Sequence, residues 1–163
     1  MPENAALSEL DAELMARALE LGHSGDPSPN PHVGAVVARE REIVGEGFHN
    51  LAGDEHAEIV ALRAAGEKAN GATLYVTIEP CNHTGRTGPC ADAIVSAGIK
   101  RVVIGTRDPN PHVQGGGVDR LREGGVEVVS GILEDEAKRL ILPWTKYVTK
   151  GASYLSLKLA ISR

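Results

Sequence analysis

The chain of 163 residues has a formal net charge of −5, and 42% of its residues are hydrophobic. This length fits one domain, which buries about two thirds of the surface that its unfolded chain exposes. The acidic balance and an aromatic content of 3% disfavour a nucleic-acid partner, and the lack of an apolar run of membrane-spanning length disfavours a membrane partner.

Hydrophobic periodicity predicts helices that alternate with short β-branched strands. We expect helices over residues 8–22, 56–65, 90–97, 117–123 and 133–142, and strands over residues 33–38, 42–48, 73–77, 101–105 and 126–129. Ser8 is predicted to cap the first helix, which Gly22 ends. Continuous apolar strands between helices indicate a sheet that is covered on both faces. The predicted fold class is therefore α/β, a three-layer α/β/α domain.

Four residues form a candidate zinc site with a proton carrier beside it. His56 and Glu58 are two residues apart, and they are followed by Pro80-Cys81 and Pro89-Cys90. This order is typical of the zinc deaminases of nucleobases. Three protein ligands leave the fourth position of a tetrahedral zinc for a water, which becomes a nucleophile near neutral pH. Residues two apart do not share a helix face, so we expect His56 to bind the metal and Glu58 to move protons.

The two cysteines could instead form a disulfide or act as small buried hydrophobes. However, each follows a proline, and Cys90 opens a predicted helix. A helix N-terminus lowers the pKa of a thiol toward the thiolate that a metal needs. We therefore predict that His56, Cys81 and Cys90 hold Zn²⁺. Because the chain has no further cysteine, a reducing cytoplasm is the expected location.

One short sequence occurs twice. Pro29-Asn-Pro-His-Val-Gly is nearly repeated at Pro109-Asn-Pro-His-Val. Both copies could simply be rigid turns, because Asn and Pro are turn formers. Alternatively, each turn presents an asparagine, Asn30 or Asn110, to a common pocket, where an amide can both donate and accept hydrogen bonds.

Several motifs between Leu14 and Trp144 together carry a resemblance to a known family. They are Pro29-Asn-Pro-His-Val-Gly, Gly47-Phe-His, His56-Ala-Glu, Thr77-Ile-Glu-Pro-Cys-Asn-His-Thr-Gly-Arg-Thr-Gly-Pro-Cys and Asp108-Pro-Asn-Pro. With these motifs the chain closely resembles the deaminase domain of the bacterial riboflavin-biosynthesis family RibD (RibG), in the cytidine-deaminase-like zinc deaminase superfamily. Eight residues separate Cys81 from Cys90 here, whereas generic cytidine-type deaminases have two.

The resemblance implies an enzyme with a mixed central sheet and a specific reaction. That reaction is the zinc-dependent hydrolytic deamination of 2,5-diamino-6-ribosylamino-4(3H)-pyrimidinone 5′-phosphate at C2, with Glu58 as the proton shuttle. The positions that match the family's substrate pocket are Asn30, His49, His83, Arg86, Asp108 and Asn110. A phosphate monoester suits Arg86 with His83 nearby, and Asp108 can accept hydrogen bonds from ribose hydroxyls.

Two alternatives to this function stay open at this point. The first is a deaminase of another free base or nucleoside, of the guanine or cytosine type. The second is a non-catalytic scaffold that zinc stabilises, although a purely structural site has no need of a proton carrier such as Glu58.

The end of the sequence suggests a second segment. We expect residues 1–150 to form the zinc-dependent deaminase domain, and residues 151–163 to be a strand that resembles the start of a missing reductase domain. Apolar residues alternate along that strand from Leu155 to Ile161. Since a lone apolar strand is a liability in water, it should pack on its own domain or pair with another chain. This favours a homo-oligomer, a dimer or larger.

Overall fold

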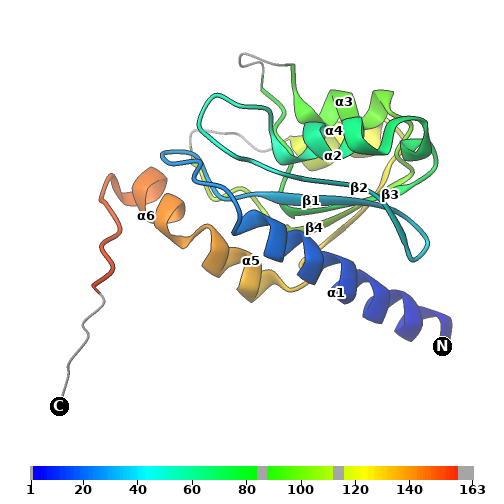
Figure 1. The fold of residues 1–163 in the computed structure, drawn as a ribbon, viewed down its shortest axis with the longest axis horizontal. Helices are drawn as coiled ribbons and strands as arrows, with labels where there is room; N and C mark the ends of the chain where they lie inside the picture. Colours follow the sequence, from blue (N-terminus) through cyan, green and yellow to red (C-terminus); the bar gives the residue numbers. More distant parts are fainter. Residues whose placement is uncertain (1, 84–87, 112–115, 158–163) are drawn as a thin grey trace.

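A five-stranded sheet lies between two layers of helices (Figure 1). In this computed structural model, which describes residues 2–83, 88–111 and 116–157, the strand order is β2-β1-β3-β4-β5. The strands are β1 (Gly34–Arg39), β2 (Glu42–Phe48), β3 (Thr73–Ile78), β4 (Arg101–Thr106) and β5 (Glu127–Ser130). Strand β1 is antiparallel to both β2 and β3, whereas β3, β4 and β5 are parallel. The predicted mixed sheet in a three-layer α/β/α sandwich is thus confirmed.

The helices divide between the two faces of the sheet. Figure 1 shows α2 (Ala57–Ala65), α3 (Cys90–Ser96) and α4 (Gly117–Glu123) on one face, and α1 (Pro2–Gly22) and α5 (Glu134–Leu140) on the other. A 3₁₀ helix (Gly66–Ala69) follows α2, and α6 (Leu142–Lys150) follows α5. Within the described part of the chain, no helix combines the length and the apolar character needed to span a membrane.

Alternating side chains of the strands fill two separate cores. Val36, Tyr75 and Val103 pack with α1 and α5, whereas their neighbours Leu74 and Val102 pack with α2, α3 and α4. Successive side chains of a strand point to opposite faces, so a strand that is buried on both faces is apolar throughout. This explains why continuous apolar runs in the sequence predicted the strands correctly.

Close packing of α2 on β2 depends on a glycine. A Cβ atom built on Gly47 would lie 2.4 Å from the backbone oxygen of Ala57, the first residue of α2. Any side chain at this position would therefore push the helix away from the sheet. The first turn of α2 is thereby held beside the last residues of β2.

Two of the predicted helices differ from the observed ones. Helix α1 begins at Pro2, so Ser8 lies inside the helix and does not cap it, although the predicted end at Gly22 is correct. The helix predicted over residues 133–142 is two helices, because α5 ends at Leu140 and α6 starts at Leu142. Pro143, in the first turn of α6, lacks the N–H that would continue the hydrogen-bond ladder of α5.

The segment after α6 also differs from its prediction. Residues 152–157 contain no strand, and Leu155 and Leu157 are 90% and 79% exposed. The strand expected from Tyr154 is therefore absent over residues 154–157, and these two leucines do not pack on the domain. Residues 158–163, which complete the expected strand, lie outside the described residues.

A buried ion pair fixes α1 to the sheet. Arg101 of β4 donates two hydrogen bonds of 2.7 Å to the carboxylate of Asp11, and the Tyr75 hydroxyl donates a third of 3.0 Å. Asp11 is only 3% exposed. Removing one partner of such a group leaves the others buried without a charge to bind, which is costly.

We predict that Asp11→Asn lowers the free energy of unfolding by about 1.5–3 kcal/mol, because the amide has no charge and only one oxygen for three donors. Urea denaturation of the zinc-loaded protein measures this change. The exposed Glu9 on the same helix provides the control Glu9→Gln, which should stay within about 0.5 kcal/mol of the parent. Equal effects of the two substitutions would contradict the structural role of Asp11.

Candidate active site

Every described residue of the candidate site lies at one end of the sheet, where the carboxyl ends of its parallel strands are. The parallel strands β3 and β4 both end there, with Ile78 paired to Thr106. Strand β1 runs the opposite way, so its first residue, Gly34, lies at this end opposite Phe48, the last residue of β2. Ligands of α/β sheets bind beyond the carboxyl ends of the strands, and the predicted position of the cysteine and Asp108 loops is confirmed.

Three elements bring the candidate metal ligands together. His56 is the N-cap residue of α2, Cys81 lies in the loop after β3, and Cys90 is the first residue of α3. The Nδ1 atom of His56 is 3.1 Å from the Sγ atom of Cys90 and 3.7 Å from that of Cys81. All three ligand atoms lie within 4.8 Å of one another. Ligand atoms around a tetrahedral zinc are roughly 3.5–3.8 Å apart, given bond lengths of about 2.0–2.3 Å, so the group fits this ion.

The electrostatics of the group favour a thiolate at Cys81. Hydrogen bonds from the Cys90 thiol, from His56 and from the Cys90 backbone N–H lower the pKa of the Cys81 thiol to about 4. The hydrogen bond between the two thiols, together with burial, raises the pKa of Cys90. The pKa of His56 is also raised, chiefly by its hydrogen bond to Cys81. A cation that replaced these protons would meet a nitrogen and sulfur donor set that is already in place.

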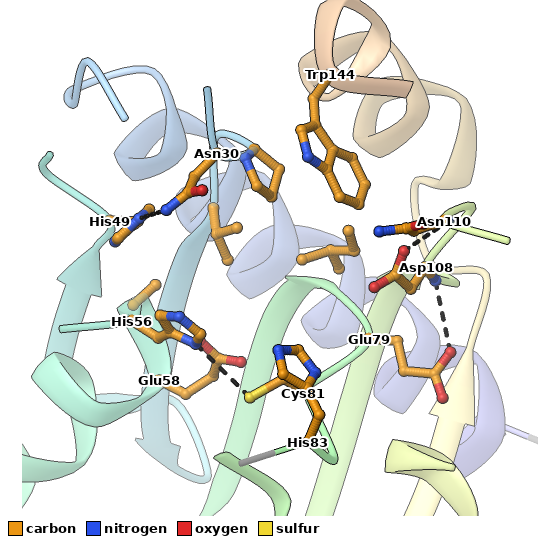
Figure 2. A pocket seen from close by; sticks show the side chains of 14 residues that line it. Asn30, His49, His56, Glu58, Glu79, Cys81, His83, Asp108, Asn110 and Trp144 are labelled. Atoms are coloured by element: carbon orange, nitrogen blue, oxygen red, sulfur yellow. Dashed lines mark hydrogen bonds between the residues drawn. The ribbon is translucent and has the colours of Figure 1, made fainter. Parts of the chain in front are cut away.

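Glu58 lies in the first turn of α2 beside this group (Figure 2). Its carboxyl is 3% exposed, and burial raises its pKa to about 7. The three residues that could hold a metal ion do not include Glu58. The structure thus places a carboxyl group next to the candidate metal ligands His56, Cys81 and Cys90, which are called the metal group below, and this carboxyl is not one of the ligands.

A pocket of about 260 Å³ opens over these residues (Figure 2). The predicted site residues that line it are Asn30, His49, His56, Glu58, Cys81, His83, Asp108 and Asn110. Cys90 is buried behind the lining. Arg86, the remaining predicted residue, lies outside the described residues. Both asparagines of the near-repeated sequence therefore reach one pocket, as the second interpretation of that repeat expected.

Asn30 is oriented by a histidine. The Nδ1 atom of His49 is 3.1 Å from the backbone oxygen of Glu55, which can only accept, so Nδ1 carries the hydrogen. The Nε2 atom is then an acceptor, and the Nδ2 group of Asn30 donates to it over 3.0 Å. This leaves the side-chain oxygen of Asn30 facing the pocket (Figure 2). The buried His49 thus fixes the orientation of the Asn30 side-chain amide.

The Asp108 loop forms the opposite wall. The Asn110 backbone N–H donates to Asp108 Oδ1 over 2.8 Å, which closes a tight turn. Burial raises the pKa of the Asp108 carboxyl, and the nearby charge of Glu79 contributes in the same direction. One carboxylate oxygen is therefore engaged within the loop.

Six residues that line the pocket were not among the predicted site residues. Four of them are apolar, namely Pro31, Val33, Ala57 and Ile78, and the other two are Glu79 and Trp144. Glu79 stands directly before Pro80-Cys81, so its place in that motif was an available signal. Trp144 comes from the first turn of α6, far along the chain, and its ring reaches the pocket opposite the metal group (Figure 2). No spacing in the sequence connects it with the other site residues.

Comparisons with known proteins agree with this geometry. Residues 8–106 match the family described as the cytidine and deoxycytidylate deaminase zinc-binding region. The riboflavin biosynthesis protein RibD of Aquifex aeolicus is 53% identical over 94% of this chain. A diaminohydroxyphosphoribosylamino-pyrimidine deaminase of Buchnera aphidicola is 50% identical over 79% of this chain and 89% of its own length. The chain belongs to the cytidine and deoxycytidylate deaminase family, in its riboflavin-biosynthesis branch.

The fold of this chain is also that of a solved RibD structure. The structure of RibD from Acinetobacter baumannii superposes with a TM-score of 0.85 at 49% identity, covering 88% of this chain. The chain described here spans only 41% of the Acinetobacter protein and 44% of the Aquifex protein, less than half the length of either relative. Zinc is the cofactor that both the family and the group of His56, Cys81 and Cys90 indicate.

We predict that the protein, purified without a chelator, contains about one zinc per chain, and that Cys90→Ser lowers this content at least tenfold because a thiolate ligand is lost. Elemental analysis by mass spectrometry measures the content. The exposed His23 gives the control His23→Ala, which should keep its zinc. A parent protein without zinc, or an active form with a Cys81–Cys90 disulfide, would refute the assignment.

Proposed function

We propose that the chain hydrolyses the C2 amine of 2,5-diamino-6-ribosylamino-4(3H)-pyrimidinone 5′-phosphate, releasing ammonia and leaving a carbonyl, as a step of riboflavin biosynthesis. The observation that carries the proposal is a buried carboxyl, Glu58, beside a three-ligand metal group at the base of a pocket. The name of the Buchnera relative, which the chain covers over 89% of its length, supports the substrate.

The residues divide the chemistry between them. Bound zinc, held by His56, Cys81 and Cys90, supplies an activated water as the nucleophile. Glu58 accepts one proton from the attacking water and delivers it to the ring nitrogen next to C2. It then takes the proton of the new C2 hydroxyl, which becomes the carbonyl, and gives it to the departing amine, which leaves as ammonia. The walls around Glu58 exclude bulk water, so the carboxyl transfers the proton rather than losing it to solvent. Proton transfer by a positioned group of this kind contributes about 10²–10⁴ in rate.

The other residues of the pocket suit the remaining parts of the substrate. The pocket-facing oxygen of Asn30 can accept a hydrogen bond from an amino group of the substrate. Asp108 and Asn110 can bind ribose hydroxyls, which both donate and accept. His83, exposed at the rim, can approach the phosphate together with Arg86, whose position lies outside the described residues.

The observations favour this substrate over a free base and over a scaffold. A deaminase of a free base, of the guanine or cytosine type, would have no use for a polar wall built from Asp108 and Asn110 beyond the base, whereas a deaminase of a nucleoside is distinguished by the substrates of the assay below. A zinc-stabilised scaffold would have no use for a buried carboxyl that is not a ligand. The polar wall and Glu58 thus argue for catalysis on a nucleotide-like substrate.

A deamination assay on the freshly prepared substrate tests the proposal. We expect ammonia release by the zinc-loaded protein, none after chelation, and recovery when zinc is restored. The dephosphorylated substrate should show a clearly higher KM. Turnover of guanine, cytosine or their nucleosides instead of the diaminopyrimidine would establish the first alternative, and no turnover of any of these would support the scaffold.

We predict that Glu58→Gln keeps its zinc and its fold but loses about 10²–10⁴ in kcat, because the amide has nearly the same shape and cannot carry the proton. Steady-state kinetics and zinc analysis are measured on the same preparation. Glu67→Gln, an exposed site on the 3₁₀ helix, is the matched control and should retain parent activity. Near-parent turnover by Glu58→Gln would exclude the proton shuttle.

We also propose that residues 1–150 form the deaminase unit, in a cytoplasmic homo-oligomer. Helix α6 ends at Lys150, and residues 151–157, of which all but the half-buried Ala152 are exposed, follow it, which supports the boundary. The need for two reduced cysteines supports a reducing compartment.

Exposed apolar side chains on α6 and in the residues after it support association. They are Leu142, Tyr147, Leu155 and Leu157. Sedimentation of the chain before and after truncation at Lys150 tests this, and an unchanged monomer would refute it.

A further inference from the structure

We propose that Glu79 is a positioning residue, which holds the Asp108 loop and the start of α4 so that the Asp108 carboxylate meets the substrate. The role of Asp108 as a substrate contact rests on the proposed function. The holding of the loop by Glu79 rests on the contacts of Glu79 alone.

Glu79 binds two segments at once. Its Oε1 atom accepts a hydrogen bond of 3.2 Å from the Val118 backbone N–H, in the first turn of α4. Its Oε2 atom lies 3.5 Å from the Asp108 backbone N–H, a contact drawn in Figure 2. Asp108 follows β4, and Val118 is ten residues further along the chain. One carboxylate therefore connects the loop that carries Asp108 with the helix that comes after it.

The backbone around Glu79 keeps this carboxylate in place. The Glu79 N–H donates to the Thr106 backbone oxygen over 2.9 Å, which extends the β3–β4 ladder by one step. The residue is 7% exposed. A Cβ atom on Gly117 would lie 2.0 Å from the Pro80 oxygen, so α4 begins in direct contact with the backbone next to Glu79. The side chain thus starts from a fixed point and has little freedom to move.

A carboxylate is the side chain that this arrangement requires. Its two oxygens both accept hydrogen bonds, and here each faces a backbone N–H donor. A glutamine of the same length would turn an NH₂ group toward one of these donors. An aspartate would keep the charge but is one methylene shorter, so it could not reach both amides from the same backbone position.

The position of Glu79 also connects the two sides of the pocket. Two residues after Glu79 the chain supplies Cys81 to the metal group, and through Asp108 the side chain of Glu79 sets the opposite wall. Since both oxygens of Glu79 are engaged by the protein, we expect it to act on the substrate through Asp108 rather than by touching the substrate. The expected consequence is a change in KM, with less effect on kcat.

Kinetics of Glu79→Gln, in the zinc-loaded chain of 163 residues, test the proposal. We expect KM for the phosphorylated diaminopyrimidine to rise about tenfold or more, with kcat within about threefold of the parent and zinc content unchanged. In the Asp108→Asn background the same substitution should raise KM far less, because both changes affect one contact. Additive effects, an unchanged KM or a loss of zinc would overturn the proposal.

Two further variants separate positioning from charge and from stability. Glu79→Asp keeps the charge and should raise KM as Glu79→Gln does, so a parent-like KM in this variant would overturn the proposal. Asp11→Asn weakens the fold at the far side of the sheet and should leave KM unchanged. If Asp11→Asn raised KM as much as Glu79→Gln does, lost stability would explain the KM increase of Glu79→Gln, and the positioning proposal would be overturned.

Amide hydrogen exchange provides a readout that does not depend on activity. In Glu79→Gln we expect the amide hydrogen of Asp108 or Val118, or both, to exchange at least about tenfold faster, with no such change in Asp11→Asn. If the parent protein does not turn over the phosphorylated diaminopyrimidine, the proposed function is wrong and exchange alone decides the role of Glu79. Unchanged exchange at both amides would overturn that role.

Discussion

The first turns of α2 and α3 meet at the carboxyl end of β3, and the rest of the site depends on this contact. His56 caps α2, Cys90 opens α3, and their side chains approach to 3.1 Å although 34 residues separate them. Helices of nine and seven residues are too short to be stable alone. Leu62 of α2 and Ile94 of α3 pack in the same core as Leu74 of β3. The metal group is therefore positioned by the apolar core beneath it.

Buried polar groups are concentrated at this same end of the sheet. Of the buried polar or charged residues in the described part of the chain, His49, Glu58 and Glu79 line the pocket. Burying such a group costs free energy unless it has partners. His49 has Asn30 and the Glu55 carbonyl, and Glu79 has two backbone amides. Burial raises the pKa of Glu58 to about 7, although its backbone hydrogen bond, the charge of His56 and a hydrogen bond with Cys90 act in the opposite direction.

Much of the fold follows from local sequence, and the places where it does not have identifiable causes. Helix α4 is observed over the predicted residues 117–123, and the strands agree within about one residue, because buried strands and short helices leave clear apolar periods. Ser8 suggested a helix start, but a capping residue is tolerated inside a helix when the flanking residues also form helix. The exposed residues 154–157 have an apolar alternation without a strand, since periodicity alone supplies no pairing partner.

The residues of the candidate site also differ in how well they could be predicted from sequence. His56, Cys81 and Cys90 could be predicted because cysteine and histidine have few other reasons to occur in that order. Trp144 could not, because a tryptophan fits many environments and only tertiary packing brings it to the pocket. The only signal for Glu79 was its place before Pro80-Cys81, which does not reveal its contacts. Residues that supply reactive atoms are thus visible in sequence, whereas those that hold others in position become visible only with the contacts.

Two sets of elements supply the pocket, and they differ in how freely they can change. The helix starts carry His56, Glu58 and Cys90, whose positions follow from the packing of α2 and α3 on the sheet. The loops beyond the strands carry Asp108 and its neighbours, whose side chains are not part of either core. Under the proposed function, substitutions in these loops alter what is bound without disturbing the core, whereas substitutions at the helix starts remove metal ligands and the proton carrier. Glu79 is an exception, since it follows a core strand and holds a loop, so a change there couples substrate binding to the sheet.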